Sequence, residues 1–289
     1  MSMPIPQLPP LLYEGLVRDA LREDLGRAGD LTSDAVVPAG LVVDGAIRAR
    51  RGGRIAGVEV AAAAFRQLDP DAALSIAAGD GSDVGAGGVV LAVRGRGRAL
   101  LAAERVALNF LGHLSGIATV TRDVVARLAG SGARVACTRK TTPLLRALEK
   151  HAVRCGGGVN HRFGLDDAVL IKDNHRAIAG SARDALARVR RAVGHLVKIE
   201  VEIDDLAELE PLLEAGVDAV LLDNMSPDEL RRAVAINRGR AILEASGGIT
   251  PETAPAIAAS GVDLLSIGWL THSAPVLDLG FDLELPAAG

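Results

Sequence analysis

Hydrophobic and polar residues follow different periods in different parts of the chain. Residues 11–25 have the amphipathic spacing of a helix, and a turn-rich connection follows them. Three short β-prone runs come next, at 42–50, 74–78 and 89–94, with an Ala-rich helical segment at 58–68. This part of the sequence predicts a small α+β unit.

A long helical pattern begins at Arg98. Its apolar residues are spaced by three and four positions and form one stripe: Leu100, Ala103, Ala107, Phe110 and Leu114. Arg105 falls on the opposite face at about 100° per residue. Leu101 and Leu108 lie between the two faces, so we expect this helix to be covered on more than one side and to join two modules.

After Gly116, short β-branched runs alternate with helical segments. The expected strands are 134–138, 168–172, 197–203, 219–223, 241–246 and 264–268. The expected helices include 142–154, 181–193, 205–215, 227–236 and 251–259, the last with Thr250 as N-cap and Pro251 at its first position.

Strict alternation of strand and helix predicts a parallel sheet with right-handed crossovers. Six to seven such units favour an open or incomplete α/β barrel, with a doubly wound open sheet as the alternative. We expect a smaller, sandwich-like α+β domain at 1–115, a barrel domain at 116–273, and a tail at 274–289 that returns to the first domain.

Composition narrows the class of protein. Hydrophobic residues make up 49% and aromatic residues 2% of the 289 positions, which is typical of a repetitive α/β core of Ala, Val, Leu and Ile. A net charge of −4 with few aromatic rings argues against nucleic-acid binding. Two cysteines are too few for a disulfide framework, and no long apolar run suits a signal peptide or membrane span. We expect a cytoplasmic protein without a membrane partner.

Positive charge is concentrated in one segment of this mildly acidic chain. Ten of the 38 residues from Thr138 to His175 are Arg, Lys or His. Arg139, Arg162 and Arg105 carry guanidinium groups that suit planar carboxylates or phosphates. The segment indicates a site for a small molecule with several anionic groups.

Polar residues end most of the predicted strands. In an α/β barrel these ends open on one face, where catalysis is found. The residues are Arg139, Lys140, Lys172, Glu202, Asp223, Ser246, Gly247 and Gly268. Glu200 and Glu202 share a strand face that would point into the barrel, where buried carboxylates need a lysine or a metal as partner.

Glu202 and Asp223 suit a hard cation such as Mg²⁺ that also binds substrate phosphates. Glycine at 247 and 268 would let the backbone approach a phosphate. More ordinary interpretations stay open: His161 could be a hydrogen-bonded structural residue, and the glycines at 156–158 could simply end a helix.

The segment TRKTTPLLRALEKHAVRCGGGVNHRFGLDDAVLIKDNH resembles the central signature of the quinolinate phosphoribosyltransferases, also called nicotinate-nucleotide pyrophosphorylases. Further similar segments are ALREDLGRAGDLTSDAVVP, ERVALNFLGHLSGIAT, VEID, LLDN, EASGGIT and GVDLLSIGWLTHS. The resemblance covers nearly the whole chain. It implies that quinolinate and phosphoribosyl pyrophosphate, with Mg²⁺, give nicotinate mononucleotide, CO₂ and pyrophosphate in NAD biosynthesis.

The resemblance also implies roles for residues. Quinolinate would be held by Arg139, His161, Arg162 and Lys172, and Lys140 would face phosphoribosyl pyrophosphate. Mg²⁺ or the ribose hydroxyls would lie at Glu202 and Asp223, and the 5′-phosphate at Ser246, Gly247 and Gly268. Members of the family form homodimers, in some cases higher oligomers, and Arg105 would reach the active site of the neighbouring subunit, since the smaller domain of one subunit closes the active site of the other.

Two residues depart from the family pattern: Leu144 replaces a usual Gly, and Ala245 a frequent Ser. We expect local repacking, and Leu144 could alter how the following helix begins. Three other functions stay open as alternatives. These are the related branch linked to molybdenum transport, a Schiff-base aldolase that uses Lys172 or Lys140, and a regulator that binds a phosphometabolite without catalysis.

Overall fold

The computed structural model describes residues 5–284 and contains two compact units. The first is made of the chain up to Arg122, the segment Pro143–Gly157 and the chain from Ser273 onward; the second is made of Asp123–Thr142 and Gly158–His272. Each is considered separately. The domain boundaries expected from the sequence, 1–115 and 116–273, stay a prediction.

The first unit is built on an antiparallel sheet of four strands in the order β12-β1-β5-β3. Its elements are η1 (Pro10–Leu12), α1 (Glu14–Leu25), α2 (Leu31–Val36), β1 (Val42–Ala49), β2 (Gly53–Arg54), α3 (Val58–Leu68), β3 (Ala73–Ile76), β4 (Asp83–Val84), β5 (Val89–Arg96), α4 (Gly97–Arg127), α5 (Arg146–Cys155) and β12 (Leu279–Glu284). The short strands β2 and β4 form a separate ribbon.

Small residues let this unit pack closely. In α3, Ala61, Ala62 and Ala64 are fully buried, which the high helix propensity and small volume of Ala allow. On β1, Gly45 lies against the ring of Phe281 in β12, and a Cβ at position 45 would come within 2.4 Å of that ring. The strand β12 therefore pairs closely with β1; residues 285–289 of the tail expected at 274–289 lie outside the described residues.

The helix α4 is longer than the sequence pattern suggested. It continues past Gly116, after which the sequence predicts alternating strands and helices, and it ends at Arg127. Gly116 is needed inside it because a Cβ there would lie 2.2 Å from the carbonyl oxygen of Pro275. Close packing against the chain thus explains a glycine that looked like a break.

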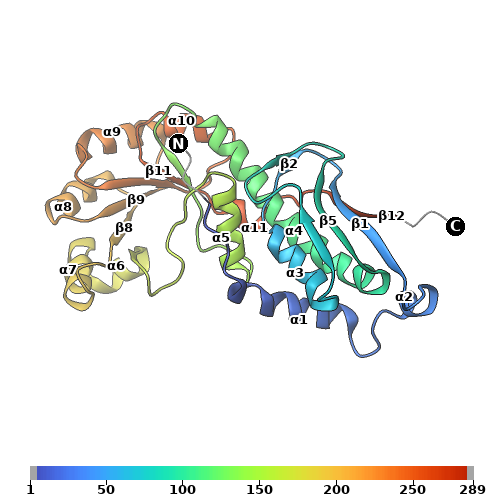
Figure 1. The fold of residues 1–289 in the computed structure, drawn as a ribbon. Helices are drawn as coiled ribbons and strands as arrows, with labels where there is room; N and C mark the ends of the chain where they lie inside the picture. The colour runs from blue at the N-terminus through green and yellow to red at the C-terminus, as the bar shows by residue number, and fades with distance from the viewer. Residues whose placement is uncertain (1–4, 285–289) are drawn as a thin grey trace. The chain divides into compact units, whose positions relative to one another are not determined.

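The second unit contains a parallel sheet of six strands in the order β6-β11-β10-β9-β8-β7. Its elements are β6 (Arg134–Ala136), β7 (Val169–Ile171), α6 (Asp173–Ala179), α7 (Ala182–Ala192), β8 (Ile199–Ile203), η2 (Leu206–Glu208), α8 (Leu209–Glu214), β9 (Ala219–Asp223), α9 (Pro227–Asn237), β10 (Ile242–Ser246), α10 (Ala254–Ala258), β11 (Leu264–Ser266) and α11 (Trp269–His272). Helices α7, α8 and α9 lie along the outside of the sheet (Figure 1).

The sheet confirms the expected open or incomplete barrel. Strands β7 to β11 are neighbours in chain order, and β6 follows on the far side of β11. Within residues 5–284 no ladder joins β6 to β7, so the barrel is open there. Val159 forms an isolated bridge with Ala136 at this edge, which brings the following His161 and Arg162 into the second unit.

Two details differ from the sequence prediction. The helix expected at 251–259 begins only at Ala254, because Thr250 to Thr253 form a hydrogen-bonded turn. A helix that the sequence analysis missed, α6, begins immediately after Lys172, with His175 accepting a hydrogen bond from the Lys172 backbone N–H. No described helix is long and apolar enough to cross a membrane.

Leu144 occupies a backbone conformation that favours glycine. Its φ is +69° and its side chain is 84% exposed. A left-handed conformation costs a residue with a Cβ about 1–2 kcal/mol. The departure from the family's glycine therefore carries local strain just before α5.

We expect Leu144→Gly to leave the protein unchanged or more stable by up to about 1 kcal/mol, because relief of the left-handed strain outweighs the entropy that glycine gains on unfolding. The free energy of unfolding in urea measures this. The matched control is Leu196→Gly, since Leu196 is also 84% exposed but lies outside the positive-φ region. Leu196→Gly should destabilise, and a greater loss from Leu144→Gly than from the control would contradict the assignment of strain.

Candidate active site

A cavity of about 450 Å³ lies at the carboxyl ends of the parallel strands, within the usual range for small-molecule sites. The strand register explains its lining, because residues paired across parallel strands share a face. Glu202 pairs with Leu221, and Asp223 pairs with Ser246. The lining residues are Thr138, Arg139, Lys140, His161, Arg162, Leu170, Lys172, Glu202, Leu221, Asp223, Glu244, Ser246 and Ser266.

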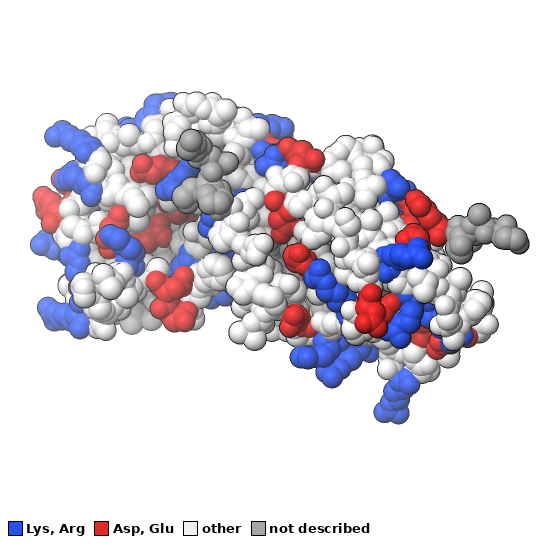
Figure 2. Space-filling view, viewed as in Figure 1, with Lys and Arg blue, Asp and Glu red and all other residues white. Residues whose placement is uncertain are grey.

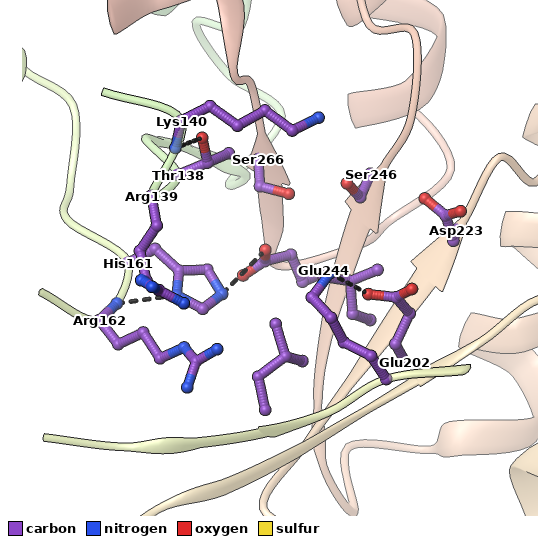
Figure 3. A pocket seen from close by; sticks show the side chains of 13 residues that line it. Thr138, Arg139, Lys140, His161, Arg162, Glu202, Asp223, Glu244, Ser246 and Ser266 are labelled. Atoms are coloured by element: carbon purple, nitrogen blue, oxygen red, sulfur yellow. Dashed lines mark hydrogen bonds and ion pairs between the residues drawn. The ribbon is translucent and has the colours of Figure 1, made fainter. Parts of the chain in front are cut away.

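Arg139 and Arg162 form the cationic side of the cavity (Figure 3). The Nε atoms of both are buried and have no hydrogen-bond partner among the described residues. Arg162 donates from Nη1 to the carbonyl of Ala168 at 3.1 Å. Burial, and then the like charge of Arg139, lower the pKa of Arg162. Two partly desolvated guanidinium groups with unused donors need an anion.

His161 is held by a buried acidic pair. Its Nδ1 accepts the backbone N–H of Arg162 at 2.8 Å, so Nε2 carries the ring proton of the neutral imidazole. Nε2 lies 3.0 Å from a Glu200 oxygen and 3.5 Å from a Glu244 oxygen. Burial, and then the charge of Glu200, raise the pKa of Glu244. His161 thereby fixes the backbone at Arg162 and ties it to the strands β8 and β10.

Glu202 and Asp223 form the acidic side. A Glu202 oxygen lies 2.8 Å from the Nζ of Lys172, and Asp223 accepts a 2.7 Å hydrogen bond from the side-chain amide of Asn224. Glu202 and Asp223 both line the cavity, and their side chains offer only carboxylate oxygens as ligands. Hard oxygen donors are the ligands that Mg²⁺ prefers.

Two glycines make room for these polar side chains. A Cβ at Gly247, whose φ is +95°, would lie 2.1 Å from the Asn224 side-chain oxygen and 2.9 Å from its backbone nitrogen. A Cβ at Gly268 would lie 3.0 Å from Cδ of Lys140. The backbone carbonyl of Lys140 accepts a 2.7 Å hydrogen bond from Thr271. These glycines therefore serve the placement of Asp223 and Lys140.

The structure brings together most of the residues that the sequence singled out. Arg139, Lys140, His161, Arg162, Lys172, Glu202, Asp223 and Ser246 all line the cavity, and Gly247 and Gly268 adjoin it. Arg105 does not line it; this residue is exposed on α4 in the first unit. Ala245 is buried on the strand face opposite Glu244 and Ser246, so its departure from the family pattern does not enter the cavity.

The sequence analysis missed Glu244, Ser266 and Asn224. Glu244 could have been found by the same alternation that singled out Glu200 and Glu202, since it lies two residues before Ser246. Ser266 ends its strand as Ser246 does. Asn224 has no pattern signal, because its role depends on the left-handed backbone at φ +55°.

Comparison with known protein families identifies the family of this chain. Residues 30–115 match the model of the quinolinate phosphoribosyl transferase N-terminal domain, and residues 117–282 match the model of its C-terminal domain. The chain belongs to the quinolinate phosphoribosyltransferase family. Quinolinate phosphoribosyltransferase activity in NAD biosynthesis is therefore the activity of this enzyme, as the sequence resemblance implied.

Individual relatives are similar in sequence to this chain over nearly their full lengths. The nicotinate-nucleotide pyrophosphorylase [carboxylating] of Mycobacterium leprae is 46% identical over 272 residues, which cover 92% of this chain and 95% of that protein. The probable enzyme of Bacillus subtilis (strain 168) is 43% identical, with 95% and 94% covered. The structure of the nicotinate-nucleotide pyrophosphorylase from Francisella tularensis superposes with a TM-score of 0.93 at 35% identity, with 98% and 100% covered.

We expect Gly247→Ala to lower both stability and activity, because its Cβ would displace Asn224 and with it the hydrogen bond to Asp223. The matched control is Gly239→Ala, which has φ +74° but open space around its Cβ. The control should be destabilised only by the strain of a Cβ in a left-handed conformation, about 1–2 kcal/mol, and should keep its specific activity. Urea unfolding and initial rates measure the two effects, and equal losses in both variants would refute the role given to Gly247.

Proposed function

We propose that the cavity binds quinolinate at its cationic side and phosphoribosyl pyrophosphate at its acidic side. The main support is the pair Arg139 and Arg162, whose buried Nε donors have no hydrogen-bond partner within residues 5–284. Quinolinate carries two adjacent carboxylates, which suit two guanidinium groups and the nearby Lys172 ammonium. His161 contributes by holding the backbone of Arg162 in position, since both of its ring nitrogens already have partners.

The other substrate would occupy the strand ends from β8 to β11. Lys140 is exposed at the cavity rim, where its ammonium can neutralise the departing pyrophosphate. Ser246 offers a hydroxyl for the 5′-phosphate, and Gly247 and Gly268 offer backbone groups beside it. Glu202 and Asp223 would hold the ribose hydroxyls or Mg²⁺.

The residues present fit a magnesium ion, because Glu202 and Asp223 are hard oxygen ligands that line one cavity. When bound, Mg²⁺ would neutralise pyrophosphate charge as that group leaves. Lys172 donates a hydrogen bond to Glu202 in this structure. If Glu202 turned to bind the metal or the ribose, Lys172 would be free to bind a quinolinate carboxylate.

Catalysis would then consist of positioning and charge stabilisation. The pyridine nitrogen attacks C1 of the ribose as the bond to pyrophosphate breaks, and positive charge on the sugar is stabilised by the carboxylates. The ring nitrogen becomes cationic in this step. The carboxylate beside it then leaves as CO₂, its bonding electrons remain on the ring carbon, and a proton replaces it to give nicotinate mononucleotide.

We also propose a homodimer in which Arg105 completes the partner's active site. The support is that Arg105 is exposed on α4 and does not line the cavity formed by its own chain. A cytoplasmic location is proposed as well, because the sequence contains only two cysteines, too few for a disulfide framework. Acidic and basic side chains are intermixed on the face drawn in Figure 2, which shows no broad basic surface among the described residues.

The direct test is mass-spectrometric detection of nicotinate mononucleotide from quinolinate, phosphoribosyl pyrophosphate and Mg²⁺. We expect product only when all three are supplied. Nicotinate in place of quinolinate should give none, because one of the two carboxylates is missing. Product formation from nicotinate at an equal rate would contradict the proposed diacid site.

Arg162→Ala and Lys140→Ala should each reduce kcat/KM by roughly a thousand-fold. Removal of Arg162, one partner of a desolvated charge pair, costs about 2–5 kcal/mol, and removal of Lys140 takes away a charge that stabilises the departing pyrophosphate, at a similar cost. Arg162→Ala should act mainly on the KM for quinolinate, and Lys140→Ala mainly on kcat. Arg188→Ala is the control, because Arg188 is exposed on α7 and donates to the carbonyl of Ala179, away from the cavity lining. Near-normal rates in either site variant, with intact circular dichroism, would refute the assignment.

Arg105→Ala and Arg139→Ala subunits should each be inactive alone but complement one another when they are co-expressed. Random pairing would restore about a quarter of the sites, because half of the dimers contain one intact composite site. Steady-state rates of the purified mixture measure this. The absence of any recovery, with dimers present by light scattering, would show that the sites are not shared.

A further inference from the structure

The first unit contains a buried group of metal-ligating side chains that the reaction does not use. His151 and Cys155 lie one helical turn apart on α5, and Asp80 lies in the turn between β3 and β4. Nε2 of His151 is 2.7 Å from an Asp80 oxygen and 3.4 Å from Sγ of Cys155. All three donor atoms lie within 4.8 Å of one another, and none of the three residues lines the cavity described above.

The backbone around this group holds the donors in place. Asp80 uses its other oxygen, Oδ1, to accept the Val58 N–H at the start of α3 at 2.9 Å, which leaves Oδ2 directed at His151. The adjacent Gly81 donates its N–H to the carbonyl of Ile55 at 2.8 Å. On the helix, positions i and i+4 share one face, so His151 and Cys155 present their donors together.

The arrangement does not suit a catalytic triad. A triad uses the two ring nitrogens separately, one for the nucleophile and one for the carboxylate. Here both the carboxylate and the sulfur approach the same nitrogen, Nε2. A single proton on Nε2 can be donated well to only one of them, whereas a metal ion at that point would bind all three.

We propose that Asp80, His151 and Cys155 form a zinc site, with water as the fourth ligand. One oxygen, one nitrogen and one sulfur donor are a set that Zn²⁺ accepts in a tetrahedral arrangement. Zinc–ligand bonds of about 2.0–2.3 Å would require Oδ2 of Asp80 and Nε2 of His151 to move apart by roughly 0.5 Å. A side-chain rotation at Asp80 can supply this movement.

Burial and access also fit a bound ion. Cys155 is 1% and His151 8% exposed, while the side chain of Asp80 is 21% exposed and leaves a path for the ion and its water. Burial, and then the negative charge of Asp80, raise the pKa of the Cys155 thiol. A dipositive ion would compensate the Asp80 carboxylate and displace the thiol proton. It would also link α5 to the turn that precedes β4.

Cobalt(II) titration of the full-length protein tests this site, because Co²⁺ reports the zinc ligands spectroscopically. We expect one Co²⁺ per chain with a thiolate-to-cobalt charge-transfer band in the near ultraviolet, and loss of the band when Zn²⁺ is added. The group His161, Glu200 and Glu244 could also take a metal but contains no sulfur and cannot give this band.

Cys155→Ala and His151→Phe should abolish the band. Cys137→Ala is the matched control, because Cys137 is the other buried cysteine and belongs to the second unit, so this variant should keep the band. Absence of the band in the unaltered protein, or its persistence in Cys155→Ala, would overturn the proposal.

Thermal unfolding gives an independent readout that does not require the variants to be as stable as the parent. Zn²⁺ should raise the Tm of the unaltered protein and of Cys137→Ala by several degrees, because a ligand that binds only the folded state stabilises it. Cys155→Ala should show no such rise. If the variants do not fold, the proposal is upheld by a band and a Tm rise in both the unaltered protein and Cys137→Ala, and is rejected by the lack of either.

Discussion

The cavity of the second unit contains an unfavourable interaction, because two arginines approach each other at its partly desolvated rim. Burial, and then the positive charge of Arg139, lower the pKa of Arg162, and neither arginine has an acceptor for its Nε among the described residues. Such a pair persists only if the surrounding structure holds it. His161 does this by accepting the Arg162 backbone N–H and directing its remaining ring nitrogen at the carboxylates of β8 and β10. A dianionic ligand, as proposed above, would relieve this repulsion by supplying acceptors to both guanidinium groups.

The open barrel explains how this arrangement is possible. A fully closed sheet would pair β6 with β7 and leave no room for an irregular segment between them. Here Val159 bridges to β6, and the chain then passes His161 and Arg162 before β7 begins. Irregular backbone at this edge can therefore place cationic side chains over the strand ends, while the carboxylates come from the regular strands.

The sequence predicted the strands and the acidic side of the site well, because both follow from alternation. Glu202, Asp223 and Ser246 end strands, and parallel pairing brings strand ends together. The roles of the glycines were less predictable. Gly247 was expected to approach a phosphate, and the structure adds that it makes room for Asn224, a contact between two loops that no local pattern records. Gly116 looked like the end of a helix and instead allows close packing inside one.

The cationic segment from Thr138 to His175 also shows why a count of charges overstates a binding site. Lys150 and His151 belong to it, yet α5, on which they lie, is part of the first unit and does not line the cavity. Glu149, Lys150 and His151 are all buried there, and Glu149 is paired with His113 at 2.8 Å. A buried helix with three consecutive ionisable residues needs partners for each of them. The same run of sequence thus contributes to two separate features, the proposed anion site in one unit and charge compensation in the other, and only the course of the backbone distinguishes them.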